Sequence, residues 1–422
     1  MQSLVGILVV AAVVVLLARR AEVRLVLLGG GFVLACLGGQ PLLIFDVFAR
    51  AMVAGLVAPI CAAMGFAAVM THTGCDRHLV ELLARPLRRA GAAVAAGGIV
   101  VAYLVNVAVP SQTSTAAAVG PILVPLMQAS GLSPVQSGAA LVLGASFGGD
   151  LLNPAAQDPM AIAGTTELSA PLIYARVWPA SLLGLLVAAA VFQWQVRKSL
   201  SAPRALDSHG QVHLGKALVP LLPLTLLLLA YAGLPPLGWL LEAPAGEAWE
   251  AVASGLPVVR AMLLGVLAIG LLCREPNVVR EFFEGMGRAY ASIISLTIVA
   301  QCFGAGLAAV GLADLILAAV SGHAWLTVSM AILFPLALAL LSGSGSGPIL
   351  TFAQTLLVKL GPGHERLAAM ACLSGAYGRT ASPVSAVVIY CAGLVNVDPR
   401  ELVGWVYQPL LAGAVVSFLV AL

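Results

Sequence analysis

Pro110-Ser111-Gln112-Thr113-Ser114-Thr115 interrupts one long apolar stretch of this chain, and Ser342-Gly343-Ser344-Gly345-Ser346-Gly347 interrupts another. Farther along each half a second apolar run is broken, at Asn153-Pro154 and at Thr380-Ala381-Ser382-Pro383. A helix that faces lipid cannot leave backbone polar groups unpaired at such depth. Paired breaks in two equivalent halves therefore indicate a polar cavity at mid-membrane, a feature typical of secondary transporters.

The composition identifies an integral membrane protein. Hydrophobic residues make up 61% of the 422 positions and charged residues only 9%, against about 25% charged in a soluble domain. Apolar runs close to the ~20 residues that cross the hydrocarbon core recur throughout. We expect ten spans, near 3–18, 23–39, 50–73, 136–165, 174–196, 217–233, 257–273, 289–311, 366–394 and 402–421. The net charge of +3 gives no indication of nucleic-acid binding, because basic residues in membrane proteins mostly set topology.

Residues 91–129 and 323–360 are too interrupted to be simple spans. We interpret each as a re-entrant hairpin, in which one helix enters the membrane, a Ser/Thr-rich tip turns, and a second helix leaves on the same side. The predicted fold is all-α and polytopic, with two inverted repeats of five spans plus one hairpin and with discontinuous helices at mid-membrane. Residues 1–200 form the first repeat, 201–216 a polar cytoplasmic linker, and 217–422 the second repeat.

The distribution of charge supports one orientation. With both termini outside, most of the 21 Lys and Arg residues fall in cytoplasmic loops, as the positive-inside rule requires. Hairpin 91–129 then opens from the cytoplasm and hairpin 323–360 from the outside. Residues 274–288 carry an apolar stripe opposite Arg280 and Glu284. This pattern predicts a helix lying in the membrane interface; a loop helix packed on the bundle is the alternative.

Arg379 is the strongest single indication of function. An arginine inside a span costs several kcal/mol unless it is paired or hydrated, so it is a functional candidate by default. Its guanidinium can hold a carboxylate through two hydrogen bonds. The alternative is a structural salt bridge to Asp158 or Asp150, the intramembrane acids of the other half. Asp150 has a further alternative role, as a cap on the following half-helix.

The interrupted segments also carry polar groups that can bind an anion or a small cation. Helix N-termini favour anions, whereas unwound carbonyls with Asn and Ser oxygens suit Na⁺. The candidate substrate contacts are Ser111, Gln112, Thr113, Ser114, Asn153, Ser344, Gly345, Ser346, Arg379, Thr380 and Ser382, and the candidate Na⁺ ligands are Asn106, Asn153 and Asp158. For any single hydroxyl, a hydrogen bond back to its own helix is the alternative.

Histidine and cysteine residues give weaker signals. His72 lies near a cytoplasmic helix end and is interpreted as structural or interfacial, with a proton relay as the alternative. The seven cysteines lie in or beside apolar segments without C-x-x-C spacing. We therefore expect small buried hydrophobic side chains, and neither a metal site nor a disulfide framework. No cofactor is expected beyond a coupling Na⁺ or H⁺.

Three stretches resemble the DcuC family of C4-dicarboxylate carriers, within the wider ion-transporter superfamily. They are Gly65-Phe66-Ala67-Ala68-Val69-Met70-Thr71-His72-Thr73-Gly74, Gly343-Ser344-Gly345, and Gly378-Arg379-Thr380-Ala381-Ser382-Pro383-Val384-Ser385. The resemblance covers nearly the whole chain. It implies that succinate, fumarate, malate or aspartate is carried by symport, exchange or efflux across a bacterial inner membrane. It also implies a homodimer of scaffold domains, each with a hairpin-containing transport domain that moves as an elevator.

The first half departs from the pattern of this family in places. Asp158 matches a family aspartate, but the preceding Asn153-Pro154-Ala155-Ala156-Gln157 differs and Asp150 is additional. A carrier for another organic anion therefore stays open as an alternative, and so does an anion channel, because Ser/Gly-rich re-entrant loops also form filters. An enzyme is not expected, because an intramembrane serine protease needs a histidine or lysine base and none lies near mid-span.

Overall fold

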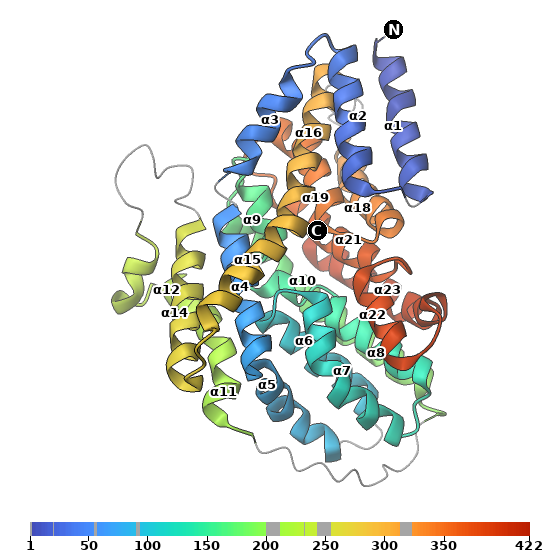
Figure 1. Ribbon diagram of the computed structural model, residues 1–422. Coiled ribbons are helices and arrows are strands. Elements are labelled where there is room, and N and C mark those ends of the chain that lie inside the picture. The colour runs from blue at the N-terminus through green and yellow to red at the C-terminus, as the bar shows by residue number, and fades with distance from the viewer. Residues whose placement is uncertain are drawn as a thin grey trace.

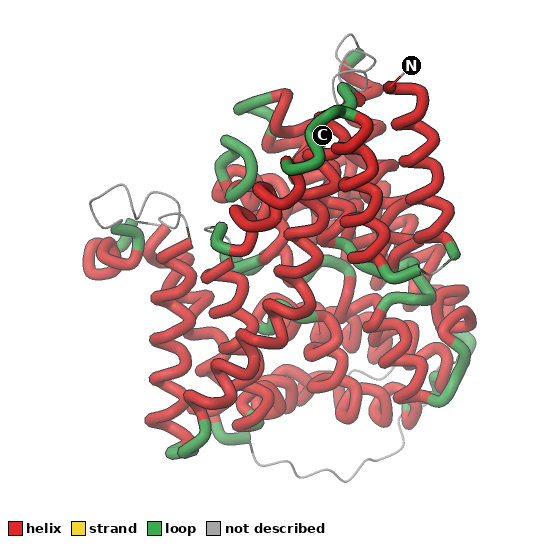
Figure 2. Tube along the Cα trace, turned by 45° about the horizontal axis from the view of Figure 1, so that its top comes forward, coloured by secondary structure: helices red, strands yellow, loops and turns green. Residues whose placement is uncertain are grey.

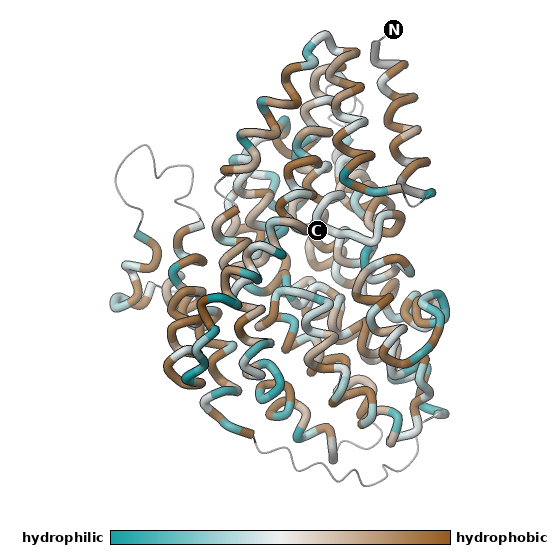
Figure 3. The backbone as a smooth tube through the Cα atoms, viewed as in Figure 1, coloured by the Kyte–Doolittle hydropathy of each residue, from teal (hydrophilic) through white to brown (hydrophobic). Residues whose placement is uncertain are grey.

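The fold is helical throughout the part of the chain that is described. The computed structural model describes residues 2–19, 21–54, 57–89, 93–199, 212–231, 233–242, 255–312 and 323–422. Every secondary-structure element in these ranges is a helix, and Figure 2 colours no strand among them. Hydrophobic residues dominate the helices, and hydrophilic residues gather mainly toward helix ends and loops (Figure 3). The all-α class predicted from composition is confirmed.

The helices follow one another with short connections. The first half contains α1 (Gln2–Ala18), α2 (Val23–Leu37), α3 (Leu43–Met52), α4 (Val57–Thr73), α5 (Cys75–Ala84), η1 (Arg85–Arg89), α6 (Val94–Ala108), α7 (Gln112–Ala129), α8 (Pro134–Ser146), η3 (Asp150–Leu152), α9 (Gln157–Ala163) and α10 (Ala170–Val196). The second half contains α11 (Leu214–Leu218), η4 (Val219–Leu221), α12 (Leu222–Tyr231), η5 (Pro235–Leu240), α14 (Leu256–Cys273), α15 (Val278–Ala289), η7 (Tyr290–Ile294), α16 (Ser295–Ala309), α18 (Ala324–Ser342), α19 (Ser346–Phe352), η8 (Ala353–Leu357), α20 (Val358–Leu360), α21 (Glu365–Thr380), α22 (Ala386–Val395) and α23 (Pro399–Ala421).

Five helical segments of the described residues are long and apolar enough to cross a membrane, with α8 to α9 (Pro134–Ala163) taken as one of them, and a sixth is added if the bent pair α3 and α4 counts as one span. This pair turns by 48°. The predicted span 50–73 is therefore two helices, and Pro59 in the first turn of α4 suits a helix start because its missing N–H would have no partner there. Each of the other nine predicted spans contains a described helix, whereas the count of ten membrane crossings stays a prediction.

Most of residues 274–288 are helical, as the sequence predicts, in α15 (Val278–Ala289). α15 continues through the π turn η7 into α16 without a break. It packs on α4, where a Cβ added to Gly65 would lie 2.7 Å from the ring of Phe282. Val278 and Phe282 are buried, while Val279 and Phe283 on the same stripe are exposed. α15 therefore packs on the bundle through part of its apolar stripe, and its position in the membrane interface stays a prediction.

Helices far apart in the sequence pack through facing glycines. α2 and α16 lie side by side (Figure 1), and a Cβ added to Gly31 would lie 2.8 Å from the backbone oxygen of Cys302. A Cβ added to Gly306 would lie 2.4 Å from the oxygen of Gly31. α10 and α23 pack in the same way, with 2.5 Å between an added Cβ at Gly413 and the oxygen of Gly184. Small residues let two backbones approach closely, which stabilises helix pairs in a membrane.

The predicted interruptions are breaks between helices. Residues 109–111 separate α6 from α7, and residues 343–345 separate α18 from α19. Residues 147–156, which include η3, separate α8 from α9, and residues 381–385 separate α21 from α22.

The predicted boundary between the repeats lies outside the described residues. Residues 200–211, which contain the repeat boundary and most of linker 201–216, lie outside the described residues, as do residues 91–92 of the first hairpin. The described end of the linker becomes helical at Leu214, where α11 begins.

Candidate functional site

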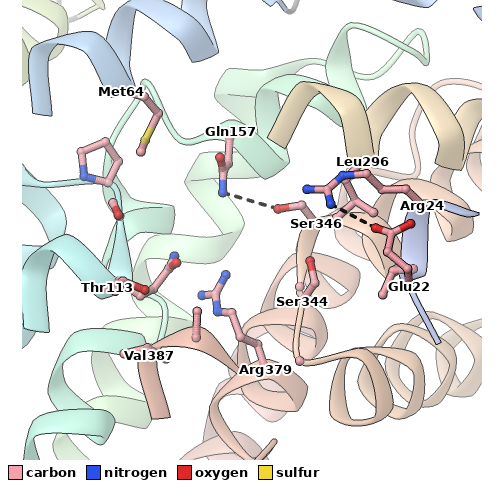
Figure 4. A pocket seen from close by; sticks show the side chains of 17 residues that line it. Glu22, Arg24, Met64, Thr113, Gln157, Leu296, Ser344, Ser346, Arg379 and Val387 are labelled. Carbon is pink, nitrogen blue, oxygen red and sulfur yellow. Dashed lines mark hydrogen bonds and ion pairs between the residues drawn. The ribbon is translucent and has the colours of Figure 1, made fainter. Parts of the chain in front are cut away.

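The breaks of both halves meet at one cavity of about 380 Å³. Its wall comprises Pro110, Ser111, Gln112 and Thr113 before and in α7, Gln157 of α9, Gly343, Ser344, Gly345 and Ser346 around the start of α19, Arg379 of α21, and Ala386 and Val387 of α22. Glu22, Val23 and Arg24 near the start of α2, Met64 of α4 and Leu296 of α16 complete the wall (Figure 4). Segments from the whole length of the chain therefore surround one polar space.

Helix N-termini converge on this cavity. α7 and α22 begin in its wall, and α19 begins there and continues through η8 into α20. The first amides of a helix have no intrahelical acceptor, and the helix dipole makes that end positive. The Ser111 hydroxyl accepts from the backbone N–H of Ser114 at 3.4 Å and so caps α7, and Ser385 caps α22 in the same way. The converging N-termini favour an anion in the cavity.

Arg379 supplies a buried positive charge to the same cavity. Its side chain lies at the end of α21 and extends toward the cavity (Figure 4), and the residue is only 7% exposed. Nη2 of Arg379 is 3.8 Å from Oδ2 of Asp150, to which the amide of Gln112 also donates. Nε and Nη2 of Arg379 make no hydrogen bond to any described residue. The salt bridge predicted as an alternative is present, and hydrogen-bond donors of the guanidinium stay unused.

Asp150 is not a helix cap. α9 begins without a side-chain cap, and the carboxylate of Asp150 is directed to Arg379 instead. Two asparagines hold the broken backbone around it: Oδ1 of Asn106 accepts from the N–H of Asp150 at 2.8 Å, and Nδ2 of Asn153 donates to the oxygen of Val107 at 2.8 Å. These contacts fix the geometry of the break between α8 and α9.

Two polar side chains of α9 lie beside the cavity. Asp158, in the first turn, is buried, and its Oδ2 has no hydrogen-bond partner within the described ranges. Nε2 of Gln157 donates to Oγ of Ser346 at 3.4 Å (Figure 4), which joins the two halves of the chain. Gln157 was not predicted as a contact; its place beside Asp158 in a broken segment was the available signal.

The structure separates the predicted substrate contacts into two groups. Ser111, Gln112, Thr113, Ser344, Gly345, Ser346 and Arg379 line the cavity. Ser114 faces a neighbouring cavity, and Asn153, Thr380 and Ser382 are buried away from the cavity wall. Thr380 donates to the backbone oxygen of Ser146 at 2.6 Å and thereby joins α21 to α8. Its hydroxyl therefore contributes to packing between the halves.

Sequence reasoning missed the part of the wall outside the breaks. Arg24, one of the basic residues that the charge pattern puts in a cytoplasmic loop, lines the cavity; its Nη1 pairs with Glu22 at 3.1 Å and its Nε donates to Ser295 at 2.7 Å. Met64 and Leu296 lie in ordinary apolar stretches. Nothing in their local pattern indicates that they face a polar space.

A second cavity of about 390 Å³ adjoins the first, because Met64 lines both. Its wall includes Ser114 of α7 and His72 of α4. Nδ1 of His72 is 3.6 Å from Glu281, and its Nε2 is 3.7 Å from Glu275. His72 therefore links α4 to α15 and to the segment before it, in a polar rather than an apolar setting.

Residues 46–422 match the DcuC family, described as C4-dicarboxylate anaerobic carriers. The chain belongs to this family. It is 28% identical over 382 residues to a probable anaerobic C4-dicarboxylate transporter, DcuC, of Vibrio cholerae. This alignment covers 86% of this chain and 80% of that relative. It is also 37% identical over 138 residues to a putative uncharacterized transporter of Haemophilus influenzae. That alignment covers 32% of this chain and 95% of the relative.

A solved transporter has a similar fold. MtrF of Neisseria gonorrhoeae, which is described as an antimetabolite efflux pump, superimposes with a TM-score of 0.60 at 14% identity, over 89% of this chain and 82% of that one. At this identity the likeness concerns the fold alone. Membership of the DcuC family makes the chain a membrane transporter rather than an enzyme, and it confirms the resemblance found in the sequence.

Proposed function

We propose that this chain carries C4-dicarboxylates across a bacterial inner membrane and that the cavity at Arg379 is its substrate site. The observation that carries the proposal is a buried guanidinium with two nitrogens free of hydrogen bonds to the described residues, next to a cavity on which helix N-termini converge. Paired donors of this kind suit a carboxylate. The Vibrio cholerae relative is named as a transporter of such anions.

A dicarboxylate has two negative ends, and the cavity offers separate partners for them. One carboxylate pairs with Arg379, and the other accepts hydrogen bonds from the first turn of α7 or of α19. The hydroxyls of Thr113, Ser344 and Ser346 stand in the same wall and add donors. In a site that excludes water each of these interactions is stronger than in solution.

Transport requires the loaded site to face each side of the membrane in turn. In support of an elevator movement, many helices pack in two groups: α6 packs on α8, α10 on α23 and α18 on α21, whereas α2 packs on α16 and α4 on α15, and the groups meet where α19 packs on α16. The cavity lies where the groups meet, because Met64 and Leu296 come from the second group and Arg379 from the first. The first group is the proposed transport domain, with α6–α7 and α18–α20 as re-entrant hairpins of inverted repeats 1–200 and 217–422.

A coupling cation completes the proposal. Arg379 is accompanied by two acids, Asp150 and Asp158, so a bound dianion leaves the site with excess negative charge, which is costly to move through a low-dielectric barrier. Na⁺ or H⁺ carried at Asp158 offsets that charge. Oδ2 of Asp158, which no described residue hydrogen-bonds, supports this choice. The Oδ1 atoms of Asn106 and Asn153 each accept one backbone N–H and keep one lone pair for a cation.

Uptake of labelled succinate into liposomes containing the purified protein tests the function. We expect saturable uptake that is driven by internal succinate or by a Na⁺ or pH gradient, and no uptake by Arg379→Ala. The matched control is Arg366→Ala, at the exposed start of the same helix, which should transport normally. Normal uptake by folded Arg379→Ala would refute the site.

The alternatives give different results in the same assay. If folded wild-type protein carries no succinate, the substrate is another organic anion. Flux that neither saturates nor exchanges would indicate an anion channel. Asp158→Asn should lose the dependence on the cation gradient while retaining exchange of internal for external succinate. The mass of the purified complex in detergent tests the proposed homodimer.

A further inference from the structure

Two cysteines that are distant in the sequence lie in contact. Sγ of Cys75 is 3.8 Å from Sγ of Cys273, and the residues are 198 positions apart. Cys75 is the buried first residue of α5, and Cys273 is the half-buried last residue of α14. A disulfide needs about 2.05 Å between the sulfurs, so the two sulfurs must move about 1.8 Å closer to form one. Cys75 is buried, as the sequence predicts, whereas Cys273 is only half-buried.

The surroundings of the pair are polar on one side. The hydroxyl of Thr73 donates to Sγ of Cys75 at 3.3 Å, and α11, which carries Lys216, packs on α5. Burial raises the pKa of the Cys75 thiol to about 11, even though the Thr73 hydrogen bond and the Lys216 charge favour its thiolate. Cys273, the more accessible of the two, is therefore the thiol that meets an oxidant first.

The pair is next to a glycine hinge. Gly74, with φ +69, is the one residue between α4 and α5, and a Cβ added there would meet nothing within 4 Å. The left-handed backbone, rather than packing, therefore requires glycine. Beyond the hinge, α5 packs on α6 and α7 (Figure 1), and α7 begins in the cavity wall. α5 thus connects helix α4, which packs on α14, to the first interrupted helix pair.

We propose that Cys75 and Cys273 are a redox modification site, at which a hydroperoxide forms a disulfide that ties α5 to the end of α14. The Cys273 thiolate attacks the O–O bond, which gives a sulfenic acid and releases water or an alcohol. The Cys75 thiol then attacks the sulfenic sulfur, and the second oxygen leaves as water. The two thiols lose two electrons, and the peroxide gains them. On the cytoplasmic side, where the charge pattern puts both residues, the pair stays reduced until oxidant is present.

The disulfide would restrain the hinge and hence α6–α7 beside the cavity, a consequence that rests on the proposed function. Movement of the transport domain needs α5 to follow α6 and α7, and a bond to α14 opposes this. The bond therefore slows transport without touching the substrate site.

Peptide mapping of the full-length protein in liposomes tests the modification by itself. After treatment with hydrogen peroxide and blocking with N-ethylmaleimide, we expect a peptide that joins Cys75 to Cys273 and that disappears with dithiothreitol. Cys273→Ser and, as a second variant, Cys75→Ala should lack it, whereas Cys36→Ser, which removes an exposed cysteine, should retain it. If, after peroxide treatment of the folded wild-type protein, both cysteines react with N-ethylmaleimide once the protein is denatured, the site is refuted.

Succinate uptake by the same samples tests the restraint. Oxidised wild-type protein should lose most of its uptake and regain it with dithiothreitol, while Cys273→Ser keeps its uptake in peroxide. A disulfide with unchanged uptake would refute the restraint and leave the modification site in place. If unoxidised protein takes up no succinate, the proposed substrate fails, and peptide mapping still decides the disulfide.

Discussion

Arg379 and Asp150 form a buried ion pair between the two halves of the chain, with 3.8 Å between Nη2 and Oδ2. Each side chain is less than a tenth exposed. The free-energy cost of removing two charges from water is offset only while they remain paired, so the stability of each residue in this position depends on the other. A carboxylate that binds Arg379 must share the guanidinium with Asp150, which holds it in place when the site is empty.

Replacing Asp150 and replacing Arg379 should lower the stability of the protein by different amounts. Asp150→Ala leaves a buried arginine, which cannot lose its proton, and should lower the free energy of unfolding by about 3–5 kcal/mol. Arg379→Ala leaves a carboxyl group that can take up a proton and become neutral, so its loss should be smaller. Thermal unfolding in detergent measures both, and the double variant should be more stable than Asp150→Ala. Equal and additive losses would contradict the pairing.

Gln157→Ala should weaken substrate binding and leave the fold intact. Gln157 lines the cavity and can turn its amide from Ser346 to the substrate, and a net value of about 1 kcal/mol for that hydrogen bond corresponds to about a fivefold rise in KM. Initial rates of succinate uptake at a series of concentrations give KM and the maximal rate separately. Gln195→Ala is the control, because Gln195 bonds Gln408 at an exposed position away from the cavity; a similar rise there would show an indirect effect.

Ser111→Ala and Ser133→Ala compare two helix caps of which one lines the cavity. Each removes a side-chain oxygen that accepts a first-turn N–H, so each should cost about 1 kcal/mol of stability. Only Ser111→Ala should also reduce succinate affinity, because α7 begins in the cavity wall and the capping box of Ser133 begins α8 elsewhere. Equal KM values for the two variants would show that the N-terminus of α7 does not bind the substrate.

Gly31→Ala and Gly29→Ala test the packing of α2 on α16 within one helix. A Cβ at Gly31 would lie 2.8 Å from the backbone of Cys302, whereas one at Gly29 meets nothing within 4 Å. Gly31→Ala should therefore destabilise the protein by about 1–3 kcal/mol. Gly29→Ala should be neutral or stabilising by up to about 1 kcal/mol, because alanine favours a helix. Thermal unfolding of the two purified variants decides this, and the reverse order would contradict the close approach.

Most of the predicted site could be found from the sequence because its signals are local. Arg379 stands out as a charge in an apolar run, and the tips at Ser111 and Ser344 stand out as hydroxyl-rich interruptions. Thr380 carries the same local signal, yet its hydroxyl bonds the backbone of Ser146 instead of lining the cavity. Composition shows that a polar group must be satisfied, but it does not show which group satisfies it.

The sequence by itself determined the class of fold, the positions of the breaks and the family, because hydropathy, interrupted apolar runs and short motifs are properties of neighbouring residues. Only the tertiary structure decided that Arg379 pairs with Asp150, that Gln157 reaches Ser346, and that Cys75 contacts Cys273. These contacts join helices far apart in the chain. Which helices meet depends on the close packing of whole faces, such as the glycine contact between α2 and α16, and no local pattern names the partner.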